Sequence, residues 1–276
     1  MQYLFGDYVQ SIGASKDSIK ASIEEHYKST KRLIRTLFET NSNLSEISMV
    51  PINIAMLCLI CSDHSVIQQF RGDFNIGRLY QEVLNWLSKR YLMKTNENKK
   101  SKDLSLNDIY NVEELNILKV VAGESFKSDT YSINGEYIHN TATNRHKDVK
   151  QVYEFGLLRA AGGAASNADG DDLIHQDHSF VHLSFQEYFT ACYFKELLLS
   201  DDKHRDTSEF IGQHRNEPKY LITLKFLAGI VTTDTSEYRD LLVQRFWESV
   251  MCNINQVIEL GLKSKVTLLM HLLSDR

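Results

Sequence analysis

The sequence predicts a mainly α-helical protein. Its 276 residues include only 2 prolines and 13 glycines, and apolar residues recur at three- and four-residue intervals over long stretches. Both observations favour helices, because proline interrupts a helix and glycine weakens one. With 42% hydrophobic residues the chain can bury sizeable cores, and we expect two or three small domains.

Residues 180–189, with the sequence FVHLSFQEYF, join an extended apolar stretch to a helix. We expect Ser184 to cap this helix by accepting a hydrogen bond from the N–H of Glu187, whose carboxylate would accept one from the N–H of Ser184 in return. Apolar residues then continue at helical spacing to about Leu199. His182 precedes this cap, at a position where free backbone donors and the helix dipole favour an anion such as phosphate.

This segment resembles the winged-helix motif of the NACHT family, nucleotide-binding switches that include the NOD-like receptors and belong to the STAND class of P-loop NTPases. That motif reads Phe-x-His-x-Ser/Thr-Phe-Gln-Glu-Phe/Tyr-Phe-x-Ala. The matching residues are Phe180, His182, Ser184, Phe185, Gln186, Glu187, Tyr188, Phe189 and Ala191. In the family the histidine contacts the β-phosphate of ADP, so the resemblance implies that His182 binds nucleotide. Without the resemblance, a single histidine between apolar residues is more often a core group than a ligand.

Residues 43–58 resemble the Pro-Leu-x-Leu element of the same family's first helical domain. In relatives the proline of this element packs near the adenine, and the resemblance implies the same role for Pro51. From the sequence alone, Pro51 has the simpler role of beginning a helix, because the first helical position needs no N–H donor. We expect the helix that follows to be deeply buried, since it is apolar nearly all round. Residues 74–94 resemble the next helix of that domain.

The middle of the chain supplies elements that the resemblance assigns to a winged-helix domain. Residues 155–160 and 179–183 are expected to pair as the strands of a small hairpin, with a mobile tip at residues 162–172. Residues 218–230 resemble the helix that opens the family's second helical domain. Further helices are expected at residues 112–126, 133–139, 149–153, 236–252 and 254–273.

The architecture implied by the resemblance is a helical domain followed by a winged-helix domain with a small β-hairpin and a further helical region. Residues 1–14 would end a nucleotide-binding domain, and residues 15–100 would form the first helical domain. Residues 101–203 would form the winged-helix domain, and residues 204–276 would begin the second helical domain.

The sequence contains neither a phosphate-binding loop of the form Gly-x-x-x-x-Gly-Lys-Ser/Thr nor an apolar strand that ends in paired acidic residues. We therefore expect no catalytic residues and no enzymatic activity from this chain alone. It would bind ADP or ATP only when a P-loop domain is supplied, either from the same gene or as a separate polypeptide. The chain would then be a truncated, split or excised regulatory part of an oligomerisation switch, with homo-oligomers as further assemblies.

Two other functions compete with this interpretation. Winged helices often bind DNA through an exposed basic helix, and Arg145, Lys147 and Lys150 are suitable residues. The formal net charge of −5 and the acidic residues at 169–172 oppose such a contact, so we do not expect nucleic acid as a partner. The second alternative is a non-functional remnant of a truncated gene.

The sequence has no apolar run long enough to span a bilayer and no signal peptide, so we expect a cytoplasmic protein without a membrane partner. Two groups of residues have partial metal-ligand spacing, but neither offers a complete set of ligands, and we expect no metal site. The first group comprises Cys58, Cys61 and His64, and the second comprises His175, His178 and His182. The four cysteines lie in apolar helical patterns without a disulfide framework: Cys58, Cys61, Cys192 and Cys252.

Overall fold

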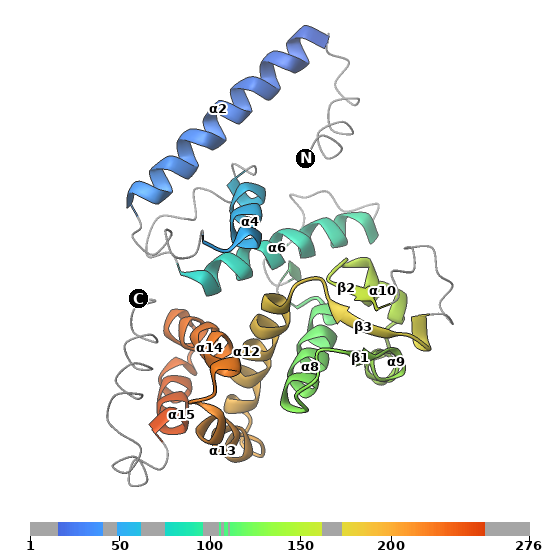
Figure 1. Cartoon of the computed structure of the whole chain (residues 1–276), viewed down its shortest axis with the longest axis vertical. Coiled ribbons are helices and arrows are strands. Elements are labelled where there is room, and N and C mark those ends of the chain that lie inside the picture. The colour runs from blue at the N-terminus through green and yellow to red at the C-terminus, as the bar shows by residue number, and fades with distance from the viewer. Residues whose placement is uncertain are drawn as a thin grey trace. The chain divides into compact units, whose positions relative to one another are not determined.

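The computed structural model describes residues 16–40, 49–61, 75–95, 105, 108–109, 111–161 and 173–251. As the sequence predicts, these residues are mainly helical and include a small three-stranded antiparallel sheet (Figure 1). The chain forms two compact units, residues 1–74 and 75–276. The expected end of a nucleotide-binding domain, the hairpin tip and the helix at 254–273 lie outside the described residues.

The first unit contains α2 (Lys16–Thr40) and α4 (Pro51–Cys61), which contact each other. The hydroxyl of Thr30 donates a 3.4 Å hydrogen bond to the carbonyl of Cys61. Pro51 occupies the first position of α4, as predicted. Burial of α4 is limited to one side, because Met56 and Ile60 are buried whereas Ile54 is exposed. The expectation that this helix is deeply buried is therefore wrong.

The second unit is built around α12 (Leu183–Leu199), which lies between α8 (Glu113–Lys127) and α14 (Leu221–Thr233) in Figure 1. Apolar and aromatic residues occur on several faces of α12, and three of its aromatic side chains are fully buried: Tyr188, Phe189 and Phe194. A helix that is apolar nearly all round is suited to such a central position.

The contact between α8 and α12 is very close at one point. Gly123 of α8 faces the ring of Tyr193 of α12, and a Cβ added to this glycine would lie 2.0 Å from the ring. The hydroxyl of Tyr193 donates a hydrogen bond to the carboxylate of the neighbouring Glu124. Only glycine at this position allows the two helices to approach so closely.

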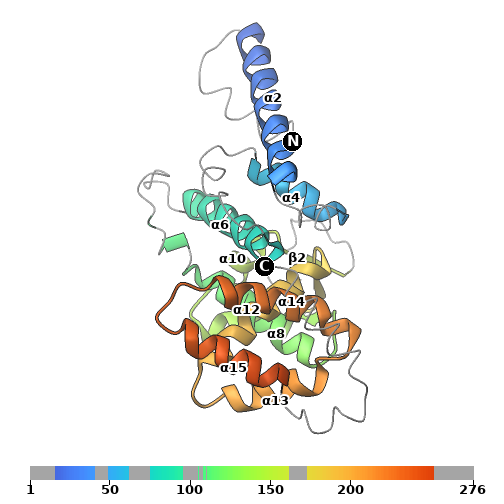
Figure 2. The same ribbon diagram turned by 90° about the vertical axis from the view of Figure 1, so that its left-hand side faces the viewer.

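The remaining helices of the second unit surround this centre. The helices α13 (His204–His214) and α15 (Arg239–Met251) pack against each other and against α12 (Figure 2). The helix α6 (Ile76–Thr95) packs against α14 and α12. A single 3-10 turn, η2 (Pro218–Tyr220), leads into α14, so the helix predicted at residues 218–230 begins with this turn.

The sheet has the strand order β1-β3-β2, with both neighbours of β3 antiparallel to it. It consists of β1 (Ile133–Asn134), β2 (Leu158–Ala160) and β3 (Asp177–Phe180). The predicted pairing of the last two strands is confirmed, with Leu158 opposite Phe180. The strand β2 starts later than predicted because Gly156, with φ of +68°, forms a turn in a conformation that favours glycine.

Two short helices, α9 (Gly135–Asn144) and α10 (Val149–Glu154), lie between β1 and β2. The helices predicted at residues 112–126 and 149–153 agree with α8 and α10 to within one residue. The helix predicted at residues 133–139 starts later, because Ile133 and Asn134 form β1. Asn134 then caps α9 by accepting a 2.8 Å hydrogen bond from the N–H of Glu136.

The sequence assigned α6 to the first helical domain, whereas α6 packs within the second unit. The division into four domains stays a prediction. In the parts of the chain that the structure describes, no helix combines the length and the apolar character needed to cross a bilayer.

Candidate functional site around His182

His182 is the N-cap residue of α12. Its backbone is extended, with φ of −149° and ψ of 141°, and its carbonyl accepts a 3.1 Å hydrogen bond from the N–H of Phe185. The ring nitrogen Nδ1 of His182 accepts a 3.2 Å hydrogen bond from the N–H of Ser184. The imidazole thus performs the task that a hydroxyl or carboxylate usually performs at this position.

The predicted capping box between Ser184 and Glu187 is therefore wrong. Ser184 lies inside the first turn of α12, and its N–H is already bonded to His182. Glu187 is buried, with 8% of its surface exposed. The helix cap consequently lies two residues earlier than the sequence pattern indicated, at the residue that was singled out for phosphate binding.

A chain of hydroxyl groups continues from this cap into the core. The Oγ atom of Ser184 lies 2.6 Å from Nδ1 of His182, and the hydroxyl of Tyr80 on α6 donates to the same Oγ at 2.5 Å. Because Nδ1 accepts from a backbone N–H, it carries no hydrogen, so the Ser184 hydroxyl must donate to it as well. The neutral imidazole therefore carries its hydrogen on Nε2.

The segment that carries the imidazole is partly exposed. His182 is half-buried, and its neighbours Val181 and Leu183 are 39% and 42% exposed. Among the described residues, Nε2 has no hydrogen-bond partner, and it does not belong to the buried polar atoms that lack one. His182 is thus bonded to the protein through one ring nitrogen and offers an N–H donor through the other. At a helix N-terminus, such a donor suits an anion.

Beneath this surface, aromatic rings hold α6 against α12. The ring of Tyr80 contacts Phe185 edge to face at a centroid distance of 5.3 Å, stacks on Tyr188 at 5.4 Å and contacts Phe226 of α14 at 4.8 Å. Burial raises the pKa of Tyr80 to about 12, and the nearby Glu187 acts in the same direction. Burial also raises the pKa of Glu187 itself to about 7. The end of the hydroxyl chain at Tyr80 is therefore packed among aromatic rings and shielded from solvent.

Pro51, the second predicted nucleotide-binding residue, lies in the first unit, at the exposed start of α4. His182 lies in the second unit. The described contacts of Pro51 are those of helix initiation, since the carbonyl of Val50 before it accepts a 3.0 Å hydrogen bond from the N–H of Asn53.

The three basic residues considered for DNA binding lie near α10. Arg145 pairs with Glu113, and Lys147 pairs at 3.0 Å with Glu114, whose side chain is almost fully buried. Lys150 is exposed at the second position of α10. Two of the three positive charges are therefore balanced within the protein, which weakens the attraction of this surface for a phosphate backbone.

Within the described ranges, no group of three or more His, Cys, Asp or Glu side chains is arranged to hold a metal ion. Cys61 is buried in α4, and burial raises the pKa of its thiol to about 12, with a further contribution from Cys58. His64 lies outside the described residues. His178 is buried in β3, where its ring packs on Tyr153 at 4.7 Å.

The sequence pattern did not indicate that Tyr80 belongs to the site. It is 104 positions away from Ser184, and its helical spacing on α6 indicated only that it belongs to a core. No local pattern signals that a buried tyrosine hydroxyl will meet a serine of another helix.

Comparison with models of protein families gives no match for this chain, and comparison with curated proteins gives none either. A function for the chain consequently depends on the motif around His182 and on the geometry described above.

Proposed function

We propose that this chain is the regulatory helical part of a nucleotide-dependent oligomerisation switch of the NACHT and STAND type. In this proposal His182 contacts the diphosphate of ADP that a P-loop domain holds. The observation that carries it is the imidazole of the partly exposed His182 at the N-terminus of α12, whose Nδ1 is occupied and whose Nε2–H is available. A neutral donor there can bond a phosphate oxygen without a change of protonation.

The order of elements supports the winged-helix part of the proposal. A helix, a strand, two helices and two further strands follow one another from α8 to β3, and β3 is the central strand. This is the order of a winged helix, with the segment between β2 and β3 as the wing. In such a domain α12 is the helix that follows the last strand, and His182 stands at their junction.

The proposed mechanism is a difference in binding between two states. A contact to ADP that exists only when α12 lies near the P-loop domain stabilises the resting state, and exchange for ATP removes this preference and permits assembly. The sequence contains neither the phosphate-binding loop motif nor an apolar strand that ends in paired acidic residues, so in this proposal the P-loop domain supplies the nucleotide and any ATPase chemistry. The resemblance to the family implies, separately, a contact between Pro51 and adenine.

Binding of DNA is less well supported. The surface near α10 retains one unpaired basic side chain, Lys150, of the three considered. Specific recognition requires several side chains that reach base edges together with contacts to phosphates.

The test is the release of fluorescently labelled ADP from a complex of this chain with the P-loop domain. His182→Ala removes both the cap and the donor, whereas His182→Ser keeps a capping oxygen and removes the donor that reaches outwards. We expect both variants to release ADP at least roughly tenfold faster, since a hydrogen bond to a charged group contributes about 1.5–3 kcal/mol. His175→Ala, at an exposed histidine of the same unit, is the matched control. Unchanged release from His182→Ser would refute the phosphate contact.

A further inference from the structure

Arg215 is a buried cation at the end of α13. It is the C-cap residue of this helix, and only 8% of its surface is exposed. In the part of the chain that the structure describes, it is the only lysine or arginine among the buried residues. A charged group inside a protein usually needs an opposite charge close by, because the hydration that it loses has to be replaced.

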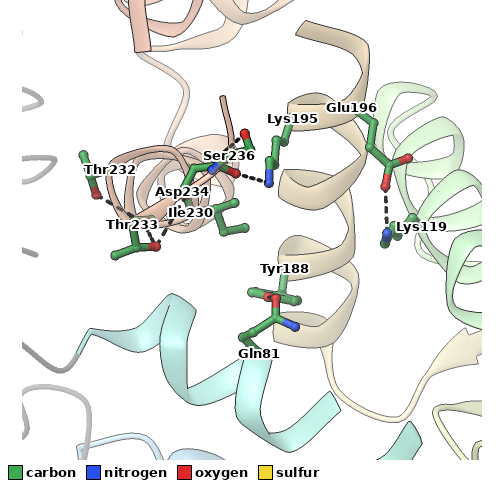
Figure 3. Close-up of polar contacts among 11 residues, drawn as sticks. Gln81, Lys119, Tyr188, Lys195, Glu196, Ile230, Thr232, Thr233, Asp234 and Ser236 are labelled. Carbon is green, nitrogen blue, oxygen red and sulfur yellow. Dashed lines mark hydrogen bonds and ion pairs between the residues drawn. The ribbon is translucent and has the colours of Figure 1, made fainter. Parts of the chain in front are cut away.

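Basic side chains around α12 do have such partners. Lys195 pairs with Asp234, the residue that follows α14, and Lys119 of α8 pairs with Glu196 at 2.7 Å (Figure 3). Both lysines are half-buried, and each has a carboxylate within hydrogen-bond distance. Arg215 is more deeply buried than either of them, and its only hydrogen bond to a described residue is to a backbone carbonyl.

The carboxylate nearest to Arg215 in the sequence is that of Glu217, and it is engaged elsewhere. It lies 2.5 Å from Nδ1 of His214 and 3.5 Å from Nζ of Lys219. Glu209, the next nearest, accepts a 3.0 Å hydrogen bond from the amide of Gln213. Within the described ranges, no acidic side chain pairs with the guanidinium of Arg215.

The guanidinium of Arg215 has one donor in use and one edge without partners. Its Nη1 donates to the carbonyl of Gly212 in the last turn of α13. Its Nε is buried and lacks a hydrogen-bond partner. Its Nη2 has no partner among the described residues either, and because it is not one of the buried atoms that lack a partner, it reaches the surface. Since Nε–H and one N–H of Nη2 are parallel in arginine, this edge presents two aligned donors.

We propose that the edge formed by Nε and Nη2 of Arg215 is a binding site for an oxyanion, either a phosphate or a carboxylate. Two oxygens of such a group match the spacing of the two donors, so the contact is bidentate. The bound anion gives Nε a partner and supplies the negative charge that no described residue provides. The site lies at the end of α13, whereas His182 lies at the start of α12, so the inference does not depend on the proposed nucleotide contact.

The test measures the thermal unfolding of the full chain at increasing concentrations of inorganic phosphate or of acetate, with the ionic strength held constant by sodium chloride. A ligand that binds only the folded state raises Tm as its concentration increases. Arg215→Met removes the charge and keeps an unbranched apolar stem. Arg205→Met, at an exposed arginine of the same helix, is the matched control.

We expect at least one of the two anions to stabilise the wild type and Arg205→Met in a saturable manner. Arg215→Met should bind that anion at least roughly tenfold more weakly, the effect of losing a hydrogen bond to a charged group. The anion that acts identifies the ligand as a phosphate or a carboxylate. Equal affinities of the wild type and Arg215→Met would overturn the inference, and so would the lack of a saturable effect of either anion on the wild type.

His182→Ser separates this site from the one at α12. It should keep the full response to the anion, and a response that is lost in His182→Ser but kept in Arg215→Met would overturn the inference. Because no nucleotide is present, these outcomes are also separate from those of the ADP-release experiment.

Arg215→Lys provides a second check if Arg215→Met does not fold. Lysine keeps the positive charge but has no edge with two parallel donors. We therefore expect this variant to bind the anion more weakly than the wild type does. Binding as tight as that of the wild type would refute the role of the edge.

Discussion

Glu187 provides the sharpest test of the energetics around α12. The residue is 8% exposed, and burial raises the pKa of its carboxyl from an ordinary value of 4.5 to about 7. A pKa that is higher in the folded protein means that the folded state binds the proton more tightly than the unfolded state does. The resulting contribution to stability is fully present below pH 4.5 and is lost as the pH rises through 7. The difference between the two pKa values corresponds to about 3 kcal/mol.

Replacing Glu187 by Gln removes the titrating group and keeps its shape. At pH 8 the variant should be more stable than the wild type by up to about 3 kcal/mol, because no charge has to be buried. For a unit of about 200 residues this corresponds to a rise in Tm of roughly 6–12 °C. At pH 4 the wild-type carboxyl is protonated, and the two proteins should have nearly equal stability.

The measurement is urea or thermal unfolding of both proteins between pH 4 and pH 8, with the difference between their stabilities plotted against pH. Glu237→Gln, at an exposed position, is the matched control and should give a difference that does not grow with pH. A stabilisation by Glu187→Gln that is equal at pH 4 and pH 8 would contradict the burial argument. A variant that is less stable than the wild type at pH 8 would refute it outright.

Two further predictions concern the sheet and the second half of α12. Burial lowers the pKa of His178 below 6.5, so the folded state binds this proton less tightly than the unfolded state does, and stability should fall as the pH drops below 6.5. The variant His178→Phe, which retains a ring against Tyr153, should reduce this loss of stability. Urea unfolding at pH 7 and pH 5 measures both proteins, and an equal loss in both would count against the prediction. Lys195→Met leaves the carboxylate of Asp234, whose side chain is 7% exposed, without its cation and should cost about 2 kcal/mol. Adding Asp234→Asn should recover part of that loss in a double-mutant cycle, and purely additive effects would show that the pair is not coupled.

The helices and the β2–β3 pairing were predictable because their signals are local. The apolar spacing of α8 and of α14 is visible within a single segment, and the two strands flank one loop rich in small residues. The two-residue strand β1 is too short to establish a period of two, and the apolar Ile133 was therefore assigned to the helix that follows. Asn134 then supplied a cap inside the predicted helix.

The cap of α12 shows why the site could be predicted only in part. The sequence contains two side chains that can accept a hydrogen bond at this helix start, His182 and Ser184, and the pattern Ser-x-x-Glu favours the serine. In the structure His182 is the N-cap residue of α12, and Glu187 is buried near Tyr80. The Ser184 hydroxyl meets Tyr80 of α6, which is distant in the sequence, and local patterns carry no sign of that contact.

The contact between Gly123 and Tyr193 limits how the second unit can deform. The ring of Tyr193 packs directly on the backbone of α8 at Gly123. If α12 rotated about its axis or slid along α8, the ring would collide with the main chain of the neighbouring turns. We therefore expect α8 and α12 to move as one rigid body. A conformational change that displaces His182 would then bend the chain at residues outside this helix pair.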